Sequence, residues 1–338
     1  MAETLLELDN LHVHYTLRGG LWRYLRHQPQ EILRAVDGVD LELTQGEMLG
    51  LVGESGCGKS TLGRTIVGLC NPTEGTVTYR GEALTADRER AKRRRIQMVF
   101  QDPYSSLNPR MTVKQTLSEL LQAHKMVPKQ GIDARCVELL DLVGLPERAL
   151  DAHPRQFSGG QRQRVAIARA LALEPELLIA DEPVSALDVS VQATVLNLLE
   201  ELREKLGLTV LLIAHNMAVV RHVADRVAVM YLGRIVEQAP TDELFTNPRH
   251  PYTQGLLTAI PRLVPGRESQ SAGVVGDPPS PIDLPSGCRF HPRCPIAQEP
   301  RCSTDDPLLT GDDHVAACHF AWTERPAVHV PEVLEEAT

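Results

Sequence analysis

The sequence lacks any apolar run of the length that a membrane helix needs. A spanning helix takes about 20 consecutive apolar residues, and no stretch of the 338 residues approaches that length. The N-terminus, MAETLLELDNLHVHY, also lacks the basic stretch and the apolar run of a signal peptide. We therefore expect a protein without a membrane span or a secretory leader, made and kept in the cytosol.

Aromatic residues are also scarce, at 4% of the chain, although 42% of the residues are apolar. The core is therefore expected to be aliphatic, and the length suits one large domain and a smaller one.

From residue 262 onward no lysine occurs, and six arginines accompany twelve acidic residues. This charge balance disfavours binding to duplex nucleic acid. Eleven of the 24 prolines lie in the same part, which predicts a change of architecture near residue 261.

Disulfide bonds are not expected, because cytosolic thiols are kept reduced. Nevertheless the chain has seven cysteines, and four of them lie in its last 51 residues: Cys288, Cys294, Cys302 and Cys318. Their wide spacing lacks the C-x-x-C pairs of zinc sites and suits a [4Fe-4S] cluster. Zinc and simply reduced, partly buried thiols remain the alternatives. His291 and His319 are close enough in sequence to replace one thiol as a ligand.

A glycine-rich segment follows a short apolar run at residues 48–52 and precedes an amphipathic helix. It fits the phosphate-loop pattern G-x-x-x-x-G-K-[ST] in the strand, turn and helix context that this motif requires. The glycines let backbone amides approach phosphates, the lysine reaches the β and γ phosphates, and the serine can bind Mg²⁺. We therefore expect ATP to bind to Gly53, Glu54, Ser55, Gly56, Cys57, Gly58, Lys59, Ser60 and Thr61.

An acidic pair, Asp181 and Glu182, ends a second apolar run at residues 177–180. An acid at the carboxyl end of a parallel strand beside a phosphate loop is well placed to hold Mg²⁺. We expect this role for Asp181, and we expect Glu182 to polarise the attacking water. The pair is a weak signal alone, but the phosphate loop about 120 residues earlier makes it a strong one.

A second anion site is predicted at Ser158, Gly159 and Gly160, which begin the amphipathic segment SGGQRQRVAIARALAL. One triphosphate does not need two such sites in one chain. Together with the phosphate loop, this segment resembles the ATP-binding subunits of ABC transporters. Their signature LSGGQ is present here as FSGGQ, with Phe157 in place of leucine and with Gln161 as its last residue.

The resemblance covers residues 5 to about 240 and implies roles for four more residues. Tyr15 would stack on adenine, although an ordinary strand tyrosine is the alternative. Gln101 would contact Mg²⁺ and the attacking water, and His215 would contact the γ phosphate. Asp188, in SALD, would lie at a dimer interface. Asn216 departs from the aspartate that is usual after the histidine, without removing a catalytic group.

The number of motifs narrows the kind of ABC ATPase. One phosphate loop and one signature about 100 residues apart exclude a tandem two-ATPase translation factor. The absence of long coiled-coil heptads between them excludes a chromosome-maintenance ATPase, and the absence of a fused membrane segment excludes an exporter half. We therefore expect a separate subunit of an importer. The segments QDPYSSLNPRMTVKQTLSELL and FTNPRHPYTQGLLTAIP, with the cysteine-rich tail, resemble the ATPases of dipeptide and oligopeptide (and nickel) importers. The chain looks most like the second, F-type ATPase of the dipeptide system. This resemblance also favours a [4Fe-4S] cluster in the tail.

The implied fold is α/β. It consists of a P-loop ABC ATPase core over residues 1–260, with a mixed sheet, an antiparallel edge subdomain and a helical subdomain at about 104–165. A small cysteine-rich domain would follow at 261–338. Two ATPase domains would form a sandwich, in which each ATP lies between the phosphate loop of one and the signature of the other.

The implied function is ATP hydrolysis, with Mg²⁺, that powers import of dipeptides or oligopeptides. The expected partners are a second, similar ATPase, two membrane permeases and, indirectly, an extracytoplasmic peptide-binding protein. The chain would work at the cytoplasmic face of the membrane. The alternatives are the ATPase of an importer for nickel or another small solute, and an ATP-dependent clamp or scaffold without a transport role.

Two charged segments complete the predictions. RERAKRRR, at residues 88–95, is predicted to be a solvated helix rather than a nucleic-acid patch. RGGLWRYLRHQPQ, at 18–30, mixes apolar and basic residues, so it could lie near the membrane or form a surface hairpin.

Overall fold

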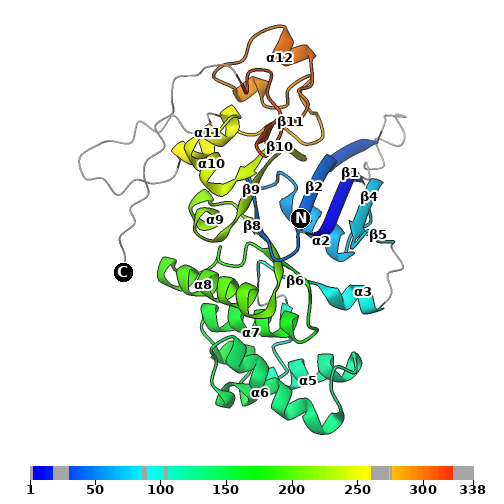
Figure 1. Ribbon diagram of the computed structural model, residues 1–338, viewed down its shortest axis with the longest axis vertical. Coiled ribbons are helices and arrows are strands. Elements are labelled where there is room, and N and C mark those ends of the chain that lie inside the picture. Colours follow the sequence, from blue (N-terminus) through cyan, green and yellow to red (C-terminus); the bar gives the residue numbers. More distant parts are fainter. Residues whose placement is uncertain are drawn as a thin grey trace, which may run out of the picture.

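Two sheets organise the part of the chain that the computed structural model describes, residues 3–17, 30–85, 90–102, 106–259, 274 and 276–322. The larger sheet has the strand order β11-β12-β10-β9-β3-β8-β7-β6, and the smaller has the order β2-β1-β4-β5. Figure 1 shows the smaller sheet beside the larger one, with α5 and α6 at the end of the molecule opposite α12. Most of the segment 18–30 lies outside the described residues.

The larger sheet consists of β3 (Met48–Val52), β6 (Ile96–Val99), β7 (Leu177–Asp181), β8 (Thr209–Ala214), β9 (Arg226–Tyr231), β10 (Arg234–Pro240), β11 (Thr310–Gly311) and β12 (Val315–Ala316). Its five central strands are parallel to one another, and β10 pairs antiparallel to β9. The apolar runs predicted as strands are β3 and β7, and both are buried along their length. Continuous burial is typical of parallel strands that are covered on both faces.

The register of the parallel strands places three chain segments at one edge. Val52 pairs with Ala214, and Asp181 pairs with Ile213. Because the carboxyl ends of parallel strands meet at the same edge of a sheet, the loops after β3, β7 and β8 lie together. These loops contain the phosphate loop, the acidic pair and the predicted histidine.

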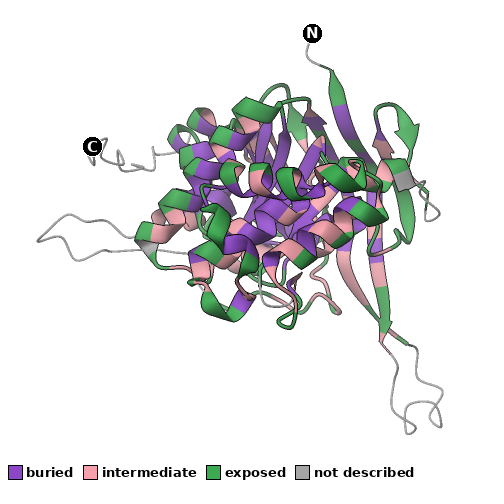
Figure 2. Ribbon diagram, turned by 90° about the horizontal axis from the view of Figure 1, so that it is seen from below, coloured by how far each residue is buried: buried purple, intermediate pink, exposed green. Residues whose placement is uncertain are grey.

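Alternate residues of the central strands divide between two hydrophobic cores. Leu49 and Ile179 belong to the core beneath the smaller sheet and α2 (Lys59–Val67), whereas Met48 and Ala180 belong to the core beneath the other helices. The smaller sheet consists of β1 (Thr4–Leu17), β2 (Glu31–Thr44), β4 (Glu74–Tyr79) and β5 (Glu82–Ala83), and all its pairs are antiparallel. Figure 2 shows the buried interior surrounded by helices with exposed outer faces.

The helices α5 (Val113–Ala123), α6 (Ile132–Leu142) and α7 (Gly159–Leu171) pack together over the stretch where a helical subdomain is expected. The others are α8 (Val189–Leu206), α9 (Met217–Val223), α10 (Thr241–Thr246), α11 (Pro251–Thr258), α12 (Arg301–Thr304) and the short helices η1 (Lys129–Gly131), η2 (Glu147–Asp151), η3 (Pro154–Gln156) and η4 (His291–Arg293). The basic segment forms α3 over Arg90–Arg95, in agreement with the predicted helix. No helix of the described part is long and apolar enough to span a membrane.

The C-terminal segment, defined here as residues 276–322, is joined to the core by backbone and aromatic contacts. Strand β12 pairs with β10, which adds two short strands to the larger sheet. Phe290 is buried and lies against the rings of Tyr231, Tyr252 and His250. These contacts bring the segment close to the phosphate loop.

Candidate active site

The phosphate loop spans residues 53–58 between β3 and α2, and two of its glycines are fixed by their surroundings. Gly53 and Gly58 have φ angles of 155° and 111°. A Cβ atom at Gly53 would lie 2.2 Å from the Met230 carbonyl oxygen, and one at Gly58 would lie 2.0 Å from the Ala35 carbonyl oxygen. Any larger residue would therefore displace the backbone at both positions.

Lys59 supplies the positive charge of the loop. Its side chain is buried, and Nζ donates to the carbonyl oxygens of Gly53 at 2.7 Å and Glu54 at 3.0 Å. Cys57 Sγ lies 3.8 Å away. Among the described residues no carboxylate forms an ion pair with Lys59. A buried ammonium without a carboxylate partner fits a site for phosphate groups.

Ser60 and Asp181, the residues predicted to hold Mg²⁺, are in direct contact. Ser60 Oγ donates to Asp181 Oδ1 at 2.8 Å. Burial raises the pKa of Asp181, since its carboxylate loses hydration. A divalent cation would favour the ionised form, and two oxygen donors of this kind are what Mg²⁺ prefers. The residues therefore fit this ion.

Two of the three predicted catalytic residues, Gln101 and His215, contact the carboxylate of the third, Glu182. Gln101 Nε2 donates to Glu182 Oε2 at 3.0 Å, and His215 Nδ1 lies 3.2 Å from the same oxygen. The Glu182 amide donates to the Ile213 carbonyl oxygen, which fixes the backbone at a φ angle of 45°. An open cavity of about 400 Å³ joins these side chains to Ser55 of the phosphate loop.

Tyr15 lies on β1 with 38% of its surface exposed. Its hydroxyl donates to Cys70 Sγ at 3.5 Å, just beyond the end of α2. Burial is the main cause that raises the pKa of Tyr15. The exposed ring leaves the adenine-stacking role as a prediction.

The signature residues begin α7 with a reciprocal cap. Ser158 Oγ accepts from the Gln161 amide, and the Gln161 side chain accepts from the Ser158 amide. The cavity beside the phosphate loop is lined by Ser55, Gln101, Asp102, Glu182, Ser185, Ala186 and His215 and by none of the signature residues. Among the described residues, the signature is therefore absent from the wall of this cavity. Asp188 is exposed at the start of α8.

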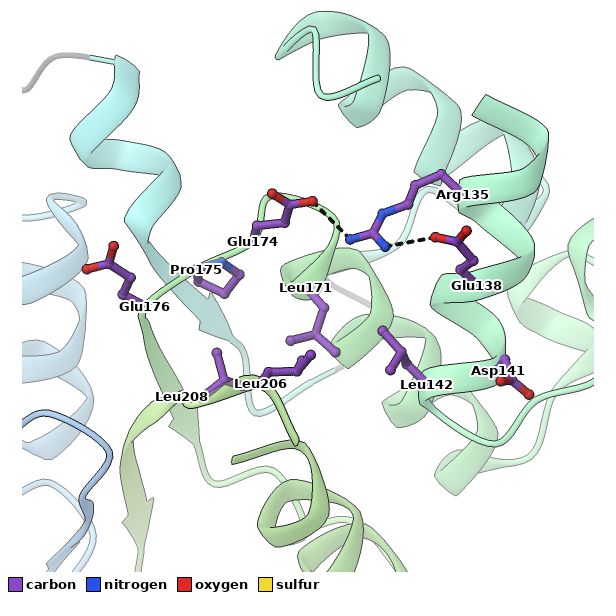
Figure 3. Close-up of a pocket in the computed structure, with 10 residues that line it drawn as sticks. All are labelled: Arg135, Glu138, Asp141, Leu142, Leu171, Glu174, Pro175, Glu176, Leu206 and Leu208. Atoms are coloured by element: carbon purple, nitrogen blue, oxygen red, sulfur yellow. Dashed lines mark hydrogen bonds and ion pairs between the residues drawn. The ribbon is translucent and has the colours of Figure 1, made fainter. Parts of the chain in front are cut away.

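A larger cavity of about 570 Å³ is separate from this site. Figure 3 shows that it lies between α6 and the residues that precede β7 and β8. Glu176 and Leu208 belong to its wall and lie at the amino ends of these strands. It is therefore at the opposite edge of the sheet from Asp181 and the phosphate loop.

The contact between the C-terminal segment and the phosphate loop was not predicted from sequence. Arg293 donates from both terminal nitrogens to the Glu54 carboxylate, at 2.7 and 2.9 Å. Tyr252 on α11 accepts from the Glu54 amide at 2.8 Å. The side chains of Arg293 and Glu54 retain 5% and 28% of their exposure, so this two-point ion pair is partly shielded from water. No pattern in the sequence indicated this contact.

We expect Arg293→Gln to raise the KM for ATP by about three- to tenfold, because the phosphate loop would lose a buried support. The turnover number at saturating ATP should change less. Steady-state phosphate release over a range of ATP concentrations gives both values. Arg301→Gln is the matched control, since Arg301 lies over the Phe320 ring instead. Equal KM values in the two variants would contradict the expected role.

Comparison with known proteins identifies the family of this site. Residues 36–185 match the family "ABC transporter", and residues 236–302 match the "oligopeptide/dipeptide transporter, C-terminal region". The oligopeptide transport ATP-binding protein AppF of Bacillus subtilis is 47% identical, over 94% of this chain and 98% of its own length. The corresponding OppF of Salmonella typhimurium is 48% identical, over 94% and 96%.

The chain belongs to the ABC ATP-binding proteins of oligopeptide and dipeptide transporters. The dipeptide transport protein DppF of Escherichia coli is another relative, 46% identical over 87% of both chains. The predicted family is therefore confirmed.

Solved structures of ABC cassettes support the same fold. The ATP-binding cassette MJ0796, solved as a dimer in a post-hydrolysis state with ADP and Pi, is 32% identical. Its TM-score is 0.61, and the match covers 70% of this chain and 99% of that one. CbiO1 from Clostridium perfringens also has a TM-score of 0.61 at 30% identity, over 72% and 91%. The prediction of a P-loop ABC ATPase fold is thereby confirmed for the core.

The prediction of a [4Fe-4S] cluster is wrong in the light of these relatives, which are named as ATP-binding proteins and not as iron–sulfur proteins. Within the described residues, no three of the four sulfur atoms gather within 4.8 Å of one another, as a single zinc ion would require. Burial raises the pKa of Cys288 to about 11, so this thiol is protonated at neutral pH. In the described residues the four cysteines are free, with Cys302 buried and the other three half-buried.

The two histidines offered as substitute ligands are also engaged elsewhere. A ring nitrogen of His291 lies 2.9 Å from the Cys288 carbonyl oxygen, and one of His319 lies 2.9 Å from the Asp305 carbonyl oxygen. Cys302 Sγ accepts from the Gln298 amide. These contacts make the cysteines part of the packing of the C-terminal segment. Wide spacing in the sequence did not separate this arrangement from a metal cluster.

Proposed function

We propose that this chain hydrolyses ATP to drive import of dipeptides or oligopeptides through a membrane transporter. One observation carries the proposal: Gln101, Glu182 and His215 converge beside a complete phosphate loop. The chain that contains them is 46–48% identical to peptide-transport ATP-binding proteins over most of its length.

The side chains divide the work of hydrolysis. Lys59 and the loop amides would bind the phosphates, and Ser60 with Asp181 would hold Mg²⁺, which neutralises phosphate charge when bound. The Glu182 carboxylate would accept a proton from the attacking water. Gln101 would orient that water, and His215 would donate to the γ phosphate. Tyr15 would support the adenine from β1.

The signature is proposed to act on the ATP of a second ATPase. Ser158 and the amides of Gly159 and Gly160 lie at the start of a 13-residue helix, where anions are favoured. Since these residues do not line the cavity at the chain's own loop, a partner ATPase would supply the other half of each site. Gln161 would fix Ser158, and Asp188 would lie at the interface. The dimeric form of MJ0796 supports this arrangement.

The remaining partners follow from the named function of the relatives. Two permease subunits would receive the movement of the ATPases at the cytoplasmic face of the membrane, and an extracytoplasmic protein would deliver the peptide. We also propose the boundary near residue 260 as the limit between the ATPase core and the C-terminal segment. That segment would support the phosphate loop through Arg293.

The test is transport in a defined system. The chain, its second ATPase and the two permeases are placed in liposomes, with ATP on the side of the ATPases and the peptide-binding protein on the other side, and uptake of labelled dipeptide, labelled oligopeptide and radioactive nickel is measured. Peptide uptake that depends on ATP is expected. Nickel uptake without peptide uptake would replace the proposed substrate, and no recruitment to permease-containing membranes would favour a clamp or scaffold.

A further inference from the structure

Three potential metal ligands gather on the smaller sheet, away from the residues proposed for hydrolysis. His12 and His14 lie on β1 two residues apart, so their side chains share one face, and Asp37 on β2 pairs with His12. Asp37 Oδ1 lies 3.1 Å from His12 Nδ1 and 2.7 Å from His14 Nε2. The described residues contain no other group of three such ligands within 4.8 Å.

Both ring nitrogens of His12 face oxygen atoms, and a neutral imidazole can donate to only one of them. Its Nε2 atom lies 3.1 Å from the Asn10 side-chain oxygen, which can only accept. A neutral imidazole has a single N–H group, so a proton on Nε2 leaves a lone pair on Nδ1. This lone pair faces the Asp37 carboxylate oxygen. A cation between the two atoms would remove the repulsion between them.

The other oxygen of Asp37 is held by the C-terminal segment. Arg289 donates from Nη2 to Asp37 Oδ2 and from Nη1 to the Leu232 carbonyl oxygen. These bonds orient the Asp37 carboxylate with Oδ1 toward the imidazoles. Ligating carboxylates in metal sites are commonly held in this way by a second group.

We propose that His12, His14 and Asp37 bind one divalent first-row transition metal ion, of the class of Zn²⁺, with water completing its coordination. Two imidazole nitrogens and one carboxylate oxygen are donors that these ions accept, whereas Mg²⁺ and Ca²⁺ favour oxygen alone. Ligands of a tetrahedral ion with bonds of about 2.0–2.2 Å lie about 3.3–3.6 Å apart, so the side chains, with N–O separations of 2.7 and 3.1 Å, would move apart slightly around the ion.

Exposure and charge set limits on the affinity. The side chains of His12, His14 and Asp37 retain 17%, 21% and 11% of their exposure, which gives an ion access from solvent. Arg289 is close by, and Arg34 lies opposite His14 in the strand register. Since these positive charges oppose a cation, we expect a moderate affinity that salt alters.

Titration of the full-length protein with Co²⁺, without nucleotide, tests the site. We expect one bound ion per chain, with visible d–d absorption and without the near-ultraviolet band of thiolate ligation. His12→Gln and His14→Gln should each weaken binding by at least about tenfold. His222→Gln is the matched control, because His222 lies beside Asn197 on the surface and should leave binding unchanged.

Thermal unfolding with and without Zn²⁺ keeps the test independent of folding defects. Zn²⁺ should raise the midpoint temperature of unfolding of the parent chain and of His222→Gln but not that of His14→Gln. The midpoint temperature of His14→Gln without metal shows whether this variant is folded. Absence of Co²⁺ binding would overturn the proposal. A proton on His12 Nδ1 would then account for its contact with Asp37 Oδ1. A thiolate band, or equal binding by His14→Gln, would also overturn it by placing the ion elsewhere.

Discussion

The variant Glu182→Gln is expected to bind ATP as tightly as the parent chain while its ATP turnover falls by about 10²- to 10⁴-fold. The amide has nearly the same shape as the carboxylate and keeps contacts with Gln101 and His215, both of which reach the Oε2 position. It cannot accept a proton from water. Binding of a slowly hydrolysed ATP analogue and steady-state phosphate release measure the two properties separately.

The matched control for this variant is Glu201→Gln. Glu201 pairs with Lys205 on the exposed face of α8 and retains 61% of its side-chain exposure. Its replacement should therefore leave both binding and turnover unchanged. Undiminished turnover in Glu182→Gln would remove Glu182 from the proposed chemistry and with it the assigned roles of its two neighbours.

The phosphate loop and the acidic pair could be predicted because each depends on residues that are adjacent in sequence. A glycine-rich turn between a strand and a helix needs only local geometry, and the strand before Asp181 is a short buried run. The approach of His215 to Glu182 required one further step, since β7 and β8 are neighbours in the sheet. The resemblance to ABC ATP-binding subunits supplied that step, because no local pattern in the sequence gives the order of the strands.

Contacts of the C-terminal segment could not be predicted in this way. Arg293 reaches Glu54 across 239 residues of sequence, and no periodic pattern relates the two positions. The group of His12, His14 and Asp37 depends on a strand register with irregularities between Leu11 and His12 and between Val13 and His14. Local sequence does not determine where such shifts occur.

The incorrect cluster prediction has a related cause. Cysteine spacing limits which ligand sets are possible, but it does not say where the sulfur atoms lie. The Cys288 amide donates to the Cys302 carbonyl oxygen, so these residues meet through their backbones. Burial among apolar neighbours is a common environment for a cysteine, and it needs no metal.

The second large effect is expected for Lys59→Met, which should weaken ATP binding by about 100-fold, or roughly 2–3 kcal/mol. Methionine retains most of the buried side-chain volume but loses the charge and the bonds from Nζ to the Gly53 and Glu54 carbonyl oxygens. The phosphates would then lack a charged donor. Equilibrium dialysis with labelled ATP and Mg²⁺ gives the dissociation constants.

Lys205→Met is the control for loss of a lysine charge, because Lys205 is exposed and pairs only weakly with Glu201 at 3.4 Å. An unchanged unfolding midpoint for Lys59→Met would assign its lower affinity to the lost charge rather than to a damaged fold. If Lys59→Met bound ATP like the parent chain, the buried ammonium would serve only to brace the loop carbonyls. The phosphate contacts would then have to come from the loop amides alone.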